Sequence, residues 1–178
     1  MNPDIERVLV TEAEIAQSVK KLGQEISQDY QGRKPLVIGI LKGSVIFMSD
    51  LVRQMSVDLE LDFMAVSSYG ASTESSGVVK IIKDLDRVVE GRDLIIVEDI
   101  VDTGRTLAYL KQLLANRNAA SIKIVALLNK ESRREVAIQA DYIGFEIDDL
   151  FVVGYGMDYS DQYRGLPYIG VLKEDVYK

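Results

Sequence analysis

Three acidic side chains and a hydroxyl-rich turn lie close together in one short stretch of the chain. Four apolar residues, 94–97, run directly into Glu98 and Asp99, and a third acid follows at Asp102. The next four residues form the turn: Thr103, Gly104, Arg105 and Thr106. The stretch therefore places carboxylates, which accept hydrogen bonds, directly beside the hydroxyl and backbone N–H groups of the turn, which donate them.

The acids and the turn favour different parts of one ligand. Hydroxyl groups and unobstructed backbone N–H groups at a helix N-terminus bind phosphate. Ionised carboxylates only accept hydrogen bonds, and they repel a phosphate by roughly 4 kcal/mol at about 4 Å for an effective dielectric of about 20. They suit hydroxyl groups or a metal ion instead. A sugar phosphate satisfies both requirements, with its hydroxyls at the acids and its phosphate in the turn.

The flanking residues place this chemistry where a strand meets a helix. Residues 94–97 are apolar and largely β-branched, which is typical of a strand buried on both faces. Leu107, Leu110 and Leu114 recur at helical spacing, so a helix is expected after the turn. Ligands of open parallel sheets bind at this edge of the strands.

A second unit of the same kind precedes it. Residues 36–41 form a buried-strand pattern, Lys42-Gly43-Ser44 follows, and a helical pattern starts at Val45. Gly43 permits an unusual backbone conformation and Ser44 is a good N-cap. The segment is either a simple capped turn or a second anion-binding turn, and its place beside the first junction favours the latter.

The rest of the pattern predicts a single α/β domain. A capping box at Thr11 starts an amphipathic helix over about 12–29, and strands are expected at 59–66 and 122–128. Alternating strands and helices predict a mainly parallel sheet with helices on both faces. We expect a core over about 30–135, and a small hood over its carboxyl edge built from the N-terminal segment and residues from about 140 to 178.

Composition excludes several kinds of chemistry. The 178 residues contain neither cysteine nor histidine, so thiol catalysis, disulfides and histidine-dependent triads are excluded. A net charge of −7 argues against a nucleic-acid partner. The first residues do not resemble a signal peptide and no apolar run is long enough for a membrane span, so the expected location is the cytoplasm.

Further candidate residues lie outside the central stretch. Lys130 follows the strand at 122–128, either as a solvated side chain or as a ligand contact. Phe151, Asp158 and Arg164 supply an aromatic face, an acid and a cation, although aromatic residues here could also be core. The small polar segment 67–77, with Ser68 and Tyr69, is either a surface loop or a lid over the ligand.

Two common nucleotide-binding motifs are absent. No G-x-x-x-x-G-K-[ST] sequence is present for a Walker-type site. The glycines at 39 and 43 do not match the G-x-G-x-x-G spacing of a dinucleotide site. A phosphoacceptor domain would leave the threonine-rich turn without a purpose.

Residues 97–107 resemble the phosphoribosyl pyrophosphate motif of type I phosphoribosyltransferases. The chain from about 5 to 172 resembles one branch, the hypoxanthine-guanine phosphoribosyltransferases of purine salvage. The segments that carry this second resemblance are 41–44, 67–70, 127–130 and 151–155 with Asp158-Tyr159. The resemblance implies the type I phosphoribosyltransferase fold.

The resemblance also implies roles for the phosphoribosyl and pyrophosphate residues. Glu98 and Asp99 would hold the ribose hydroxyls, directly or through Mg²⁺. The 5-phosphate loop would comprise Asp102, Thr103, Gly104, Arg105 and Thr106. Lys42 and Gly43 would contact pyrophosphate, in this family through a non-proline cis peptide, and Arg164 would help to hold it.

A third set of residues would bind the base. Lys130 would donate to the purine 6-oxo group, Phe151 would stack on the ring, and Val152 would contact its edge through the backbone. Asp158 would bind a second Mg²⁺ in the purine and pyrophosphate region. Ser68 and Tyr69 would close over the site as a lid.

The implied reaction transfers a 5-phosphoribosyl group to N9 of a 6-oxopurine and releases pyrophosphate. Hypoxanthine, guanine and xanthine all remain open, with IMP and GMP as products. Asp102 is the candidate general base for the purine N7 proton, or alternatively only orders the turn. A homodimer or homotetramer is expected. The alternatives are a phosphoribosyltransferase-like regulator that binds RNA and a generic nucleotide-binding module.

Overall fold

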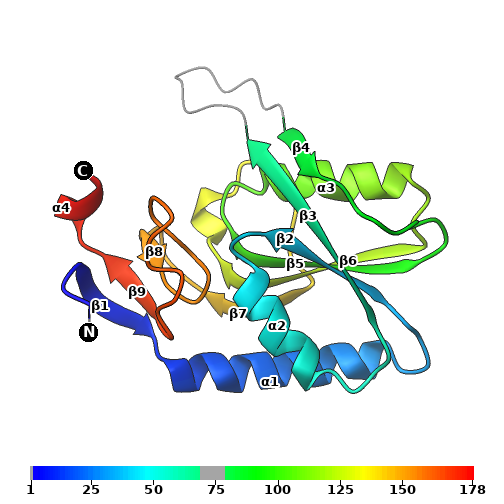
Figure 1. Ribbon diagram of the computed structural model, residues 1–178, viewed down its shortest axis with the longest axis horizontal. Helices are drawn as coiled ribbons and strands as arrows, with labels where there is room; N and C mark the ends of the chain where they lie inside the picture. Colours follow the sequence, from blue (N-terminus) through cyan, green and yellow to red (C-terminus); the bar gives the residue numbers. More distant parts are fainter. Residues whose placement is uncertain (1, 69–78) are drawn as a thin grey trace.

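The computed structural model describes residues 2–68 and 79–178 and arranges them around two sheets (Figure 1). The large sheet has the strand order β4-β3-β2-β5-β6-β7, and all neighbours are parallel except β3 and β4. Its strands are β2 (Leu36–Leu41), β3 (Glu60–Ser68), β4 (Val79–Lys83), β5 (Asp93–Val101), β6 (Ser121–Asn129) and β7 (Tyr142–Glu146). The predicted α/β class with a mainly parallel sheet is confirmed.

The small sheet joins the two ends of the chain. It consists of β1 (Ile5–Val10), β9 (Ile169–Leu172) and β8 (Val152–Val153), with β9 in the centre and both pairings antiparallel. Figure 1 shows it beyond the carboxyl ends of β2, β5 and β6. The expected hood boundary near residue 140 differs from this arrangement, because β7 belongs to the large sheet.

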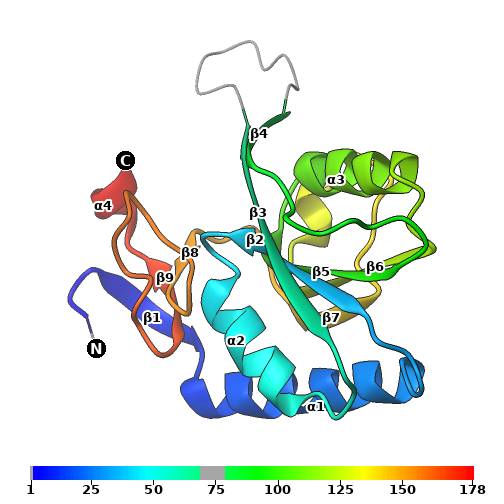
Figure 2. The same cartoon turned by 45° about the vertical axis from the view of Figure 1, so that its right-hand side comes forward.

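Helices cover both faces of the large sheet (Figure 2). Helices α1 (Glu12–Asp29) and α2 (Val45–Gln54) lie on one face, and α3 (Arg105–Asn116) lies on the other. Short helical turns occur at η1 (Glu131–Arg133) and α4 (Glu174–Tyr177). The predicted helix over 12–29 matches α1, and the capping box at Thr11 is present.

Alternation along the strands divides the core into two layers. In β5, Ile95 and Val97 pack with α1 and α2, whereas Leu94 and Ile96 pack with α3. This is the period of two that a strand imposes on its side chains. No helix in the described ranges is both long and apolar enough to cross a membrane.

The strand ends bring the predicted turns to one edge. Residues 36–39 of β2 pair in register with 94–97 of β5, and Val101 at the end of β5 pairs with Asn129 at the end of β6. The turns after β2, β5 and β6 therefore share the carboxyl edge. Strand β3 reaches Ser68, which pairs with Val79, while Tyr69 of the predicted lid lies outside the described residues.

Candidate active site

The turn between β5 and α3 requires glycine at its centre. Gly104 is the N-cap of α3 and has φ +81°, a conformation that side chains disfavour. A Cβ there would lie 2.6 Å from Ile138 Cγ2 and 2.8 Å from Arg134 Cδ. A cavity of about 250 Å³ adjoins the turn and is lined by Glu98, Asp102, Thr103, Gly104 and Thr106 among others. Glu98 was predicted for the ribose hydroxyls, and the other four residues were predicted for the 5-phosphate loop.

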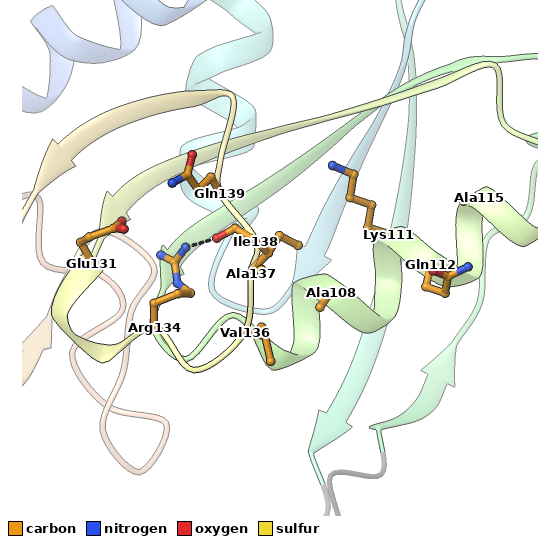
Figure 3. A pocket seen from close by; sticks show the side chains of 10 residues that line it. All are labelled: Ala108, Lys111, Gln112, Ala115, Glu131, Arg134, Val136, Ala137, Ile138 and Gln139. Atoms are coloured by element: carbon orange, nitrogen blue, oxygen red, sulfur yellow. Dashed lines mark hydrogen bonds between the residues drawn. The ribbon is translucent and has the colours of Figure 1, made fainter.

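Arg134 holds the turn in place through hydrogen bonds, and this role was not identified from the sequence. Its Nε donates to the Asp102 carbonyl at 3.2 Å, and its guanidinium also donates to the side chain of Asn129. Figure 3 shows its further hydrogen bond to the Ile138 carbonyl. The Glu135 N–H donates to the Thr103 carbonyl at 3.0 Å. These contacts fix the backbone of the turn through the segment after η1.

A separate cavity of about 810 Å³ lies between α3 and the segment after η1 (Figure 3). Its lining includes Lys111, Gln112, Arg134 and Gln139 around an apolar floor. Arg134 links this cavity to the turn through its hydrogen bond to the Asp102 carbonyl. None of the predicted site residues lines this cavity, so we assign it no part in the proposed site.

The adjacent acids of β5 face different cavities. Consecutive strand residues point to opposite faces, and Glu98 accordingly lines the cavity of the turn, whereas Asp99 lines a second cavity of about 510 Å³. Asp102 and Ile100 border both cavities. The assignment of both acids to the ribose hydroxyls stays a prediction, because Glu98 and Asp99 line neighbouring cavities that share Ile100 and Asp102.

Burial favours the neutral, protonated form of both Glu98 and Asp99. Burial and then the neighbouring Asp99 raise the pKa of Glu98 well above its usual range. Burial also raises the pKa of Asp99, and the Arg164 guanidinium partly opposes that rise. A buried carboxylate without a compensating cation favours its neutral form. Cationic or hydroxyl groups of a ligand would stabilise the ionised forms.

The second cavity brings together all four residues predicted for the purine site, along with Asp99 and Asp102. Those predicted from the sequence are Asp99, Asp102, Lys130, Phe151, Val152 and Asp158. The cavity also contains residues that the sequence did not identify: Ile100, Arg133, Asp149, Leu150, Met157 and Tyr177. An aromatic ring, a buried ammonium and several carboxylates thus converge next to the turn that is predicted to bind phosphate, residues 103–106, hereafter the phosphate turn.

Lys130 is held at the end of β6 by specific contacts. Its N–H donates to the Val101 carbonyl at 2.9 Å, and its side chain is 9% exposed. Its Nζ lies 3.6 Å from Asp149 Oδ1. The solvated alternative for this residue is therefore wrong. Arg133 extends the network, with Nε 3.3 Å from Asp102 Oδ1 and Nη1 3.6 Å from Asp149 Oδ2.

The turn after β2 lies against Asp99. A Cβ on Gly43 would lie 1.8 Å from Asp99 Oδ2, so this position admits only glycine. The peptide bond between Leu41 and Lys42 is cis, one bond before the Lys42-Gly43 pair. Ser44 is the N-cap of α2, but its hydroxyl donates to the Ile40 carbonyl at 2.7 Å rather than capping the helix.

Lys42 and Arg164 meet around one carboxylate. Lys42 Nζ lies 3.2 Å from Asp161 Oδ1, and Arg164 Nη2 lies 3.3 Å from the same oxygen. Arg164 also pairs with Asp158 Oδ1 at 2.9 Å. The hydrogen bond from Lys42, and then that from Arg164, lowers the pKa of Asp161. The two predicted pyrophosphate cations are thus neighbours, and Asp161 is a residue that the sequence did not reveal.

The acids do not make a metal site by themselves. Across residues 2–68 and 79–178, no three acidic side chains are close enough to form a metal-binding group. Asp99 and Asp158 nevertheless line one cavity, and carboxylate oxygens are the donors that Mg²⁺ prefers. Mg²⁺ commonly binds through one or two carboxylates and completes its shell with water and substrate phosphates. The donor set fits an ion that arrives with its substrate.

Comparison with known proteins identifies the family. Residues 9–160 match the model of the phosphoribosyl transferase domain. The chain belongs to this family. The type I phosphoribosyltransferase fold predicted from the sequence is confirmed by this match and by the similar structures described next.

Similar proteins align with this phosphoribosyltransferase over nearly its whole length. It is 59% identical over 178 residues to the hypoxanthine-guanine phosphoribosyltransferase of Bacillus subtilis, covering 100% of this chain and 99% of that protein. It is 52% identical over 177 residues to the Streptococcus pyogenes protein of the same name, covering 99% and 98%. A crystal structure of a Staphylococcus aureus hypoxanthine phosphoribosyltransferase has a TM-score of 0.95 at 50% identity, covering 98% and 95%.

Proposed function

We propose that this phosphoribosyltransferase is a hypoxanthine-guanine phosphoribosyltransferase of purine salvage. It transfers the 5-phosphoribosyl group of phosphoribosyl pyrophosphate to N9 of a 6-oxopurine and releases pyrophosphate. The observation that carries the proposal is the cavity shared by Lys130, Phe151 and Asp102, which adjoins the phosphate turn. The relatives of that name, similar over nearly their full length, support it.

The 5-phosphate is assigned to the turn at the start of α3. Thr103 and Thr106 supply hydroxyls, and the backbone around Gly104 supplies N–H groups at a helix N-terminus. Arg105 lies at the same terminus, paired with Glu135 at 2.5 Å. Arg134 is assigned to keeping the turn in shape, because three of its N–H groups donate to backbone and side-chain oxygens around the turn.

The ribose is assigned to the border of the two cavities, and the pyrophosphate to the cations beside Asp158. Glu98 and Asp99 are assigned to the ribose hydroxyls, and Lys42 and Arg164 to the pyrophosphate. Bound Mg²⁺ would neutralise the charge of the departing pyrophosphate, and Asp99 and Asp158 are the side chains placed to hold it. Gly43 lets its backbone approach this region closely, since Asp99 leaves no room for a side chain.

Base selection is assigned to the second cavity. The Lys130 ammonium can donate but not accept a hydrogen bond, so it suits a 6-oxo group and opposes the 6-amino group of adenine. Phe151 stacks on the ring, and the Val152 backbone contacts its edge. A site that meets a donor with a donor rejects the wrong base strongly. Asp149 Oδ1, 3.6 Å from Lys130 Nζ, orients that ammonium.

Asp102 is proposed as the general base that accepts the purine N7 proton. It borders both cavities, so its carboxylate lies where the base and the ribose meet. The Arg133 Nε, which lies 3.3 Å from Asp102 Oδ1, orients this carboxylate. Ser68, at the end of β3, and Tyr69 are proposed as the lid that excludes water from the ribose cation. We also propose a cytoplasmic homodimer or homotetramer.

A turnover assay tests the proposal directly. The protein is incubated with Mg²⁺ and phosphoribosyl pyrophosphate, and with adenine, hypoxanthine, guanine or xanthine in turn. We expect nucleotide formation from hypoxanthine or guanine and none from adenine. Absence of turnover with every 6-oxopurine would overturn the proposal, and salt-sensitive RNA binding in its place would indicate a regulatory protein.

A further inference from the structure

Two aromatic side chains hold the ring of Phe151 from different directions. The Tyr177 ring, from α4, stacks on it with centroids 4.6 Å apart and an interplanar angle of 19°. The Tyr159 ring meets it edge-on, at 5.6 Å and 86°. Tyr177 and Phe151 also line the same cavity as Lys130. An aromatic residue from the C-terminal helix therefore belongs to the surroundings of the proposed base site.

The backbone of Phe151 is held by hydrogen bonds, but its ring is partly exposed. Contacts from other side chains are therefore needed to restrict the ring to one orientation. The Phe151 carbonyl accepts a hydrogen bond from the Leu172 N–H at 2.9 Å, and the next residue, Val152, pairs with Val171 of β9. The residue itself is 37% exposed. A partly exposed side chain samples several rotamers, and restricting it to one opposes binding through lost entropy.

Tyr177 is itself anchored. The segment that carries it follows β9 and is fixed where the Lys173 N–H donates to the Asp4 carbonyl at 3.0 Å. Helix α4 then begins at Glu174, and the Lys178 N–H donates to the Glu174 carbonyl at 2.9 Å. Tyr177 packs with the cluster around Ile5, Val153 and Leu172. Its ring is thus supported by the small sheet and in turn supports Phe151.

We propose that Tyr177 is a positioning residue of the purine site, which holds the Phe151 ring in the orientation that stacks on the base. This inference rests on the proposed function and extends the base site to the C-terminal helix. Stacked aromatic pairs contribute beyond their buried area. Preorganisation of Phe151 strengthens binding of the base alone, because Tyr177 lines the second cavity and not the cavity of the turn assigned to the 5-phosphate.

Kinetics of Tyr177→Ala and Tyr177→Phe test the inference. We expect Tyr177→Ala to raise the KM for the purine roughly threefold to tenfold. The KM for phosphoribosyl pyrophosphate and kcat should stay within about twofold of wild type. Tyr177→Phe keeps the stacked ring and should restore the purine KM. Tyr109→Ala, which removes a tyrosine with 37% exposure on α3, is the matched control and should leave all three parameters unchanged.

Other results would overturn the inference in recognisable ways. A lower purine KM in Tyr177→Ala would mean that Tyr177 obstructs the base, and an unchanged KM would mean that it plays no part. An equal rise in both KM values with a lower Tm would indicate only a structural role for α4. Absence of turnover in the wild-type protein is a different failure, since it removes the proposed function itself.

Discussion

At the scale of single residues, neighbouring side chains modify the chemistry that residue types suggest. Asp102 is one of three acids in a short stretch, yet it borders both cavities and pairs with Arg133. Glu98 is buried with its pKa raised, while Asp161 is exposed with its pKa lowered by Lys42 and Arg164. Each difference leads to a separate expectation.

Asp102→Asn should abolish most of the catalytic rate while leaving substrate binding largely intact. Asparagine keeps the size of the side chain but cannot accept the N7 proton at neutral pH. We expect kcat to fall by about 10²- to 10⁴-fold with little change in the KM for phosphoribosyl pyrophosphate, measured by steady-state kinetics. A kcat within about twofold of wild type would show that Asp102 only orders the turn.

Glu98→Gln should stabilise the free protein in a pH-dependent way. The folded-state pKa of Glu98 is raised, so its contribution to stability is fully present below the ordinary glutamate pKa of about 4.3 and is lost as pH rises towards the folded value. The variant escapes this loss. Its Tm advantage over wild type should therefore be larger at about pH 8 than at about pH 5. Glu25→Gln, at an exposed position of α1, should show no such trend.

Asp161→Asn should tighten pyrophosphate binding. The Asp161 carboxylate occupies Lys42 and Arg164, the cations assigned to pyrophosphate, and an incoming anion must displace it. Because the pairs are exposed, the expected gain is small, about twofold to fivefold in Kd by calorimetry with Mg²⁺ present. Asp58→Asn, before β3 at the opposite edge, is the control. Weaker binding in Asp161→Asn would assign Asp161 to organising the cations instead.

At the scale of elements, hydrophobic periodicity and turn chemistry were sufficient to predict the units of the large sheet. The apolar run before Glu98 and the leucine spacing after Thr106 indicate β5 and α3, which the structure contains. Strand alternation predicts that Glu98 and Asp99 point to opposite faces, but the cavity that each side chain lines could be assigned only from the structure. Contacts such as those of Arg134 and Asp161 involve loops whose paths depend on tertiary packing, so local sequence did not reveal them.

Gly104→Ala tests the turn at the start of α3. The substitution imposes a disfavoured φ and a clash with Ile138, so we expect the free energy of unfolding to fall by about 2–4 kcal/mol and the KM for phosphoribosyl pyrophosphate to rise. Denaturant unfolding and kinetics measure the two effects. Gly32→Ala is the control for backbone strain without a clash, because Gly32 also has positive φ, +75°, but has open space around it. Equal losses in both variants would exclude the packing effect.

At the scale of the whole molecule, the proposed ligand spans two sheets. The phosphate turn belongs to the large sheet, whereas Phe151 and Val152 lie at the small one. The class of fold was predictable from alternating strands and helices, and the two chain ends build a small sheet as expected. The place where this hood begins was not predictable, because β7, which was expected in it, pairs with β6 of the large sheet and strand pairing leaves no local pattern.

A nucleotide product should therefore stabilise the entire fold. GMP at about 100 times its Kd should add about 2.7 kcal/mol and raise Tm by roughly 5–10 °C, by mass action. The measurement is thermal unfolding with and without ligand. AMP shares the phosphate and ribose but lacks the 6-oxo group, so its shift should be much smaller. Equal shifts for GMP and AMP would show that Lys130 does not select the base.

The central place of β9 in the small sheet has a consequence for how the protein is made. Strands β1 and β8 both pair with β9, and Ile5 meets Leu172 across this sheet. During synthesis the N-terminal portion of a chain emerges first, so β1 must wait, unpaired, until β9 has left the ribosome. The phosphate turn can form earlier, within the large sheet. We therefore expect a nascent chain to form the turn assigned to phosphate before the region around Phe151, which depends on the pairing of β8 with β9.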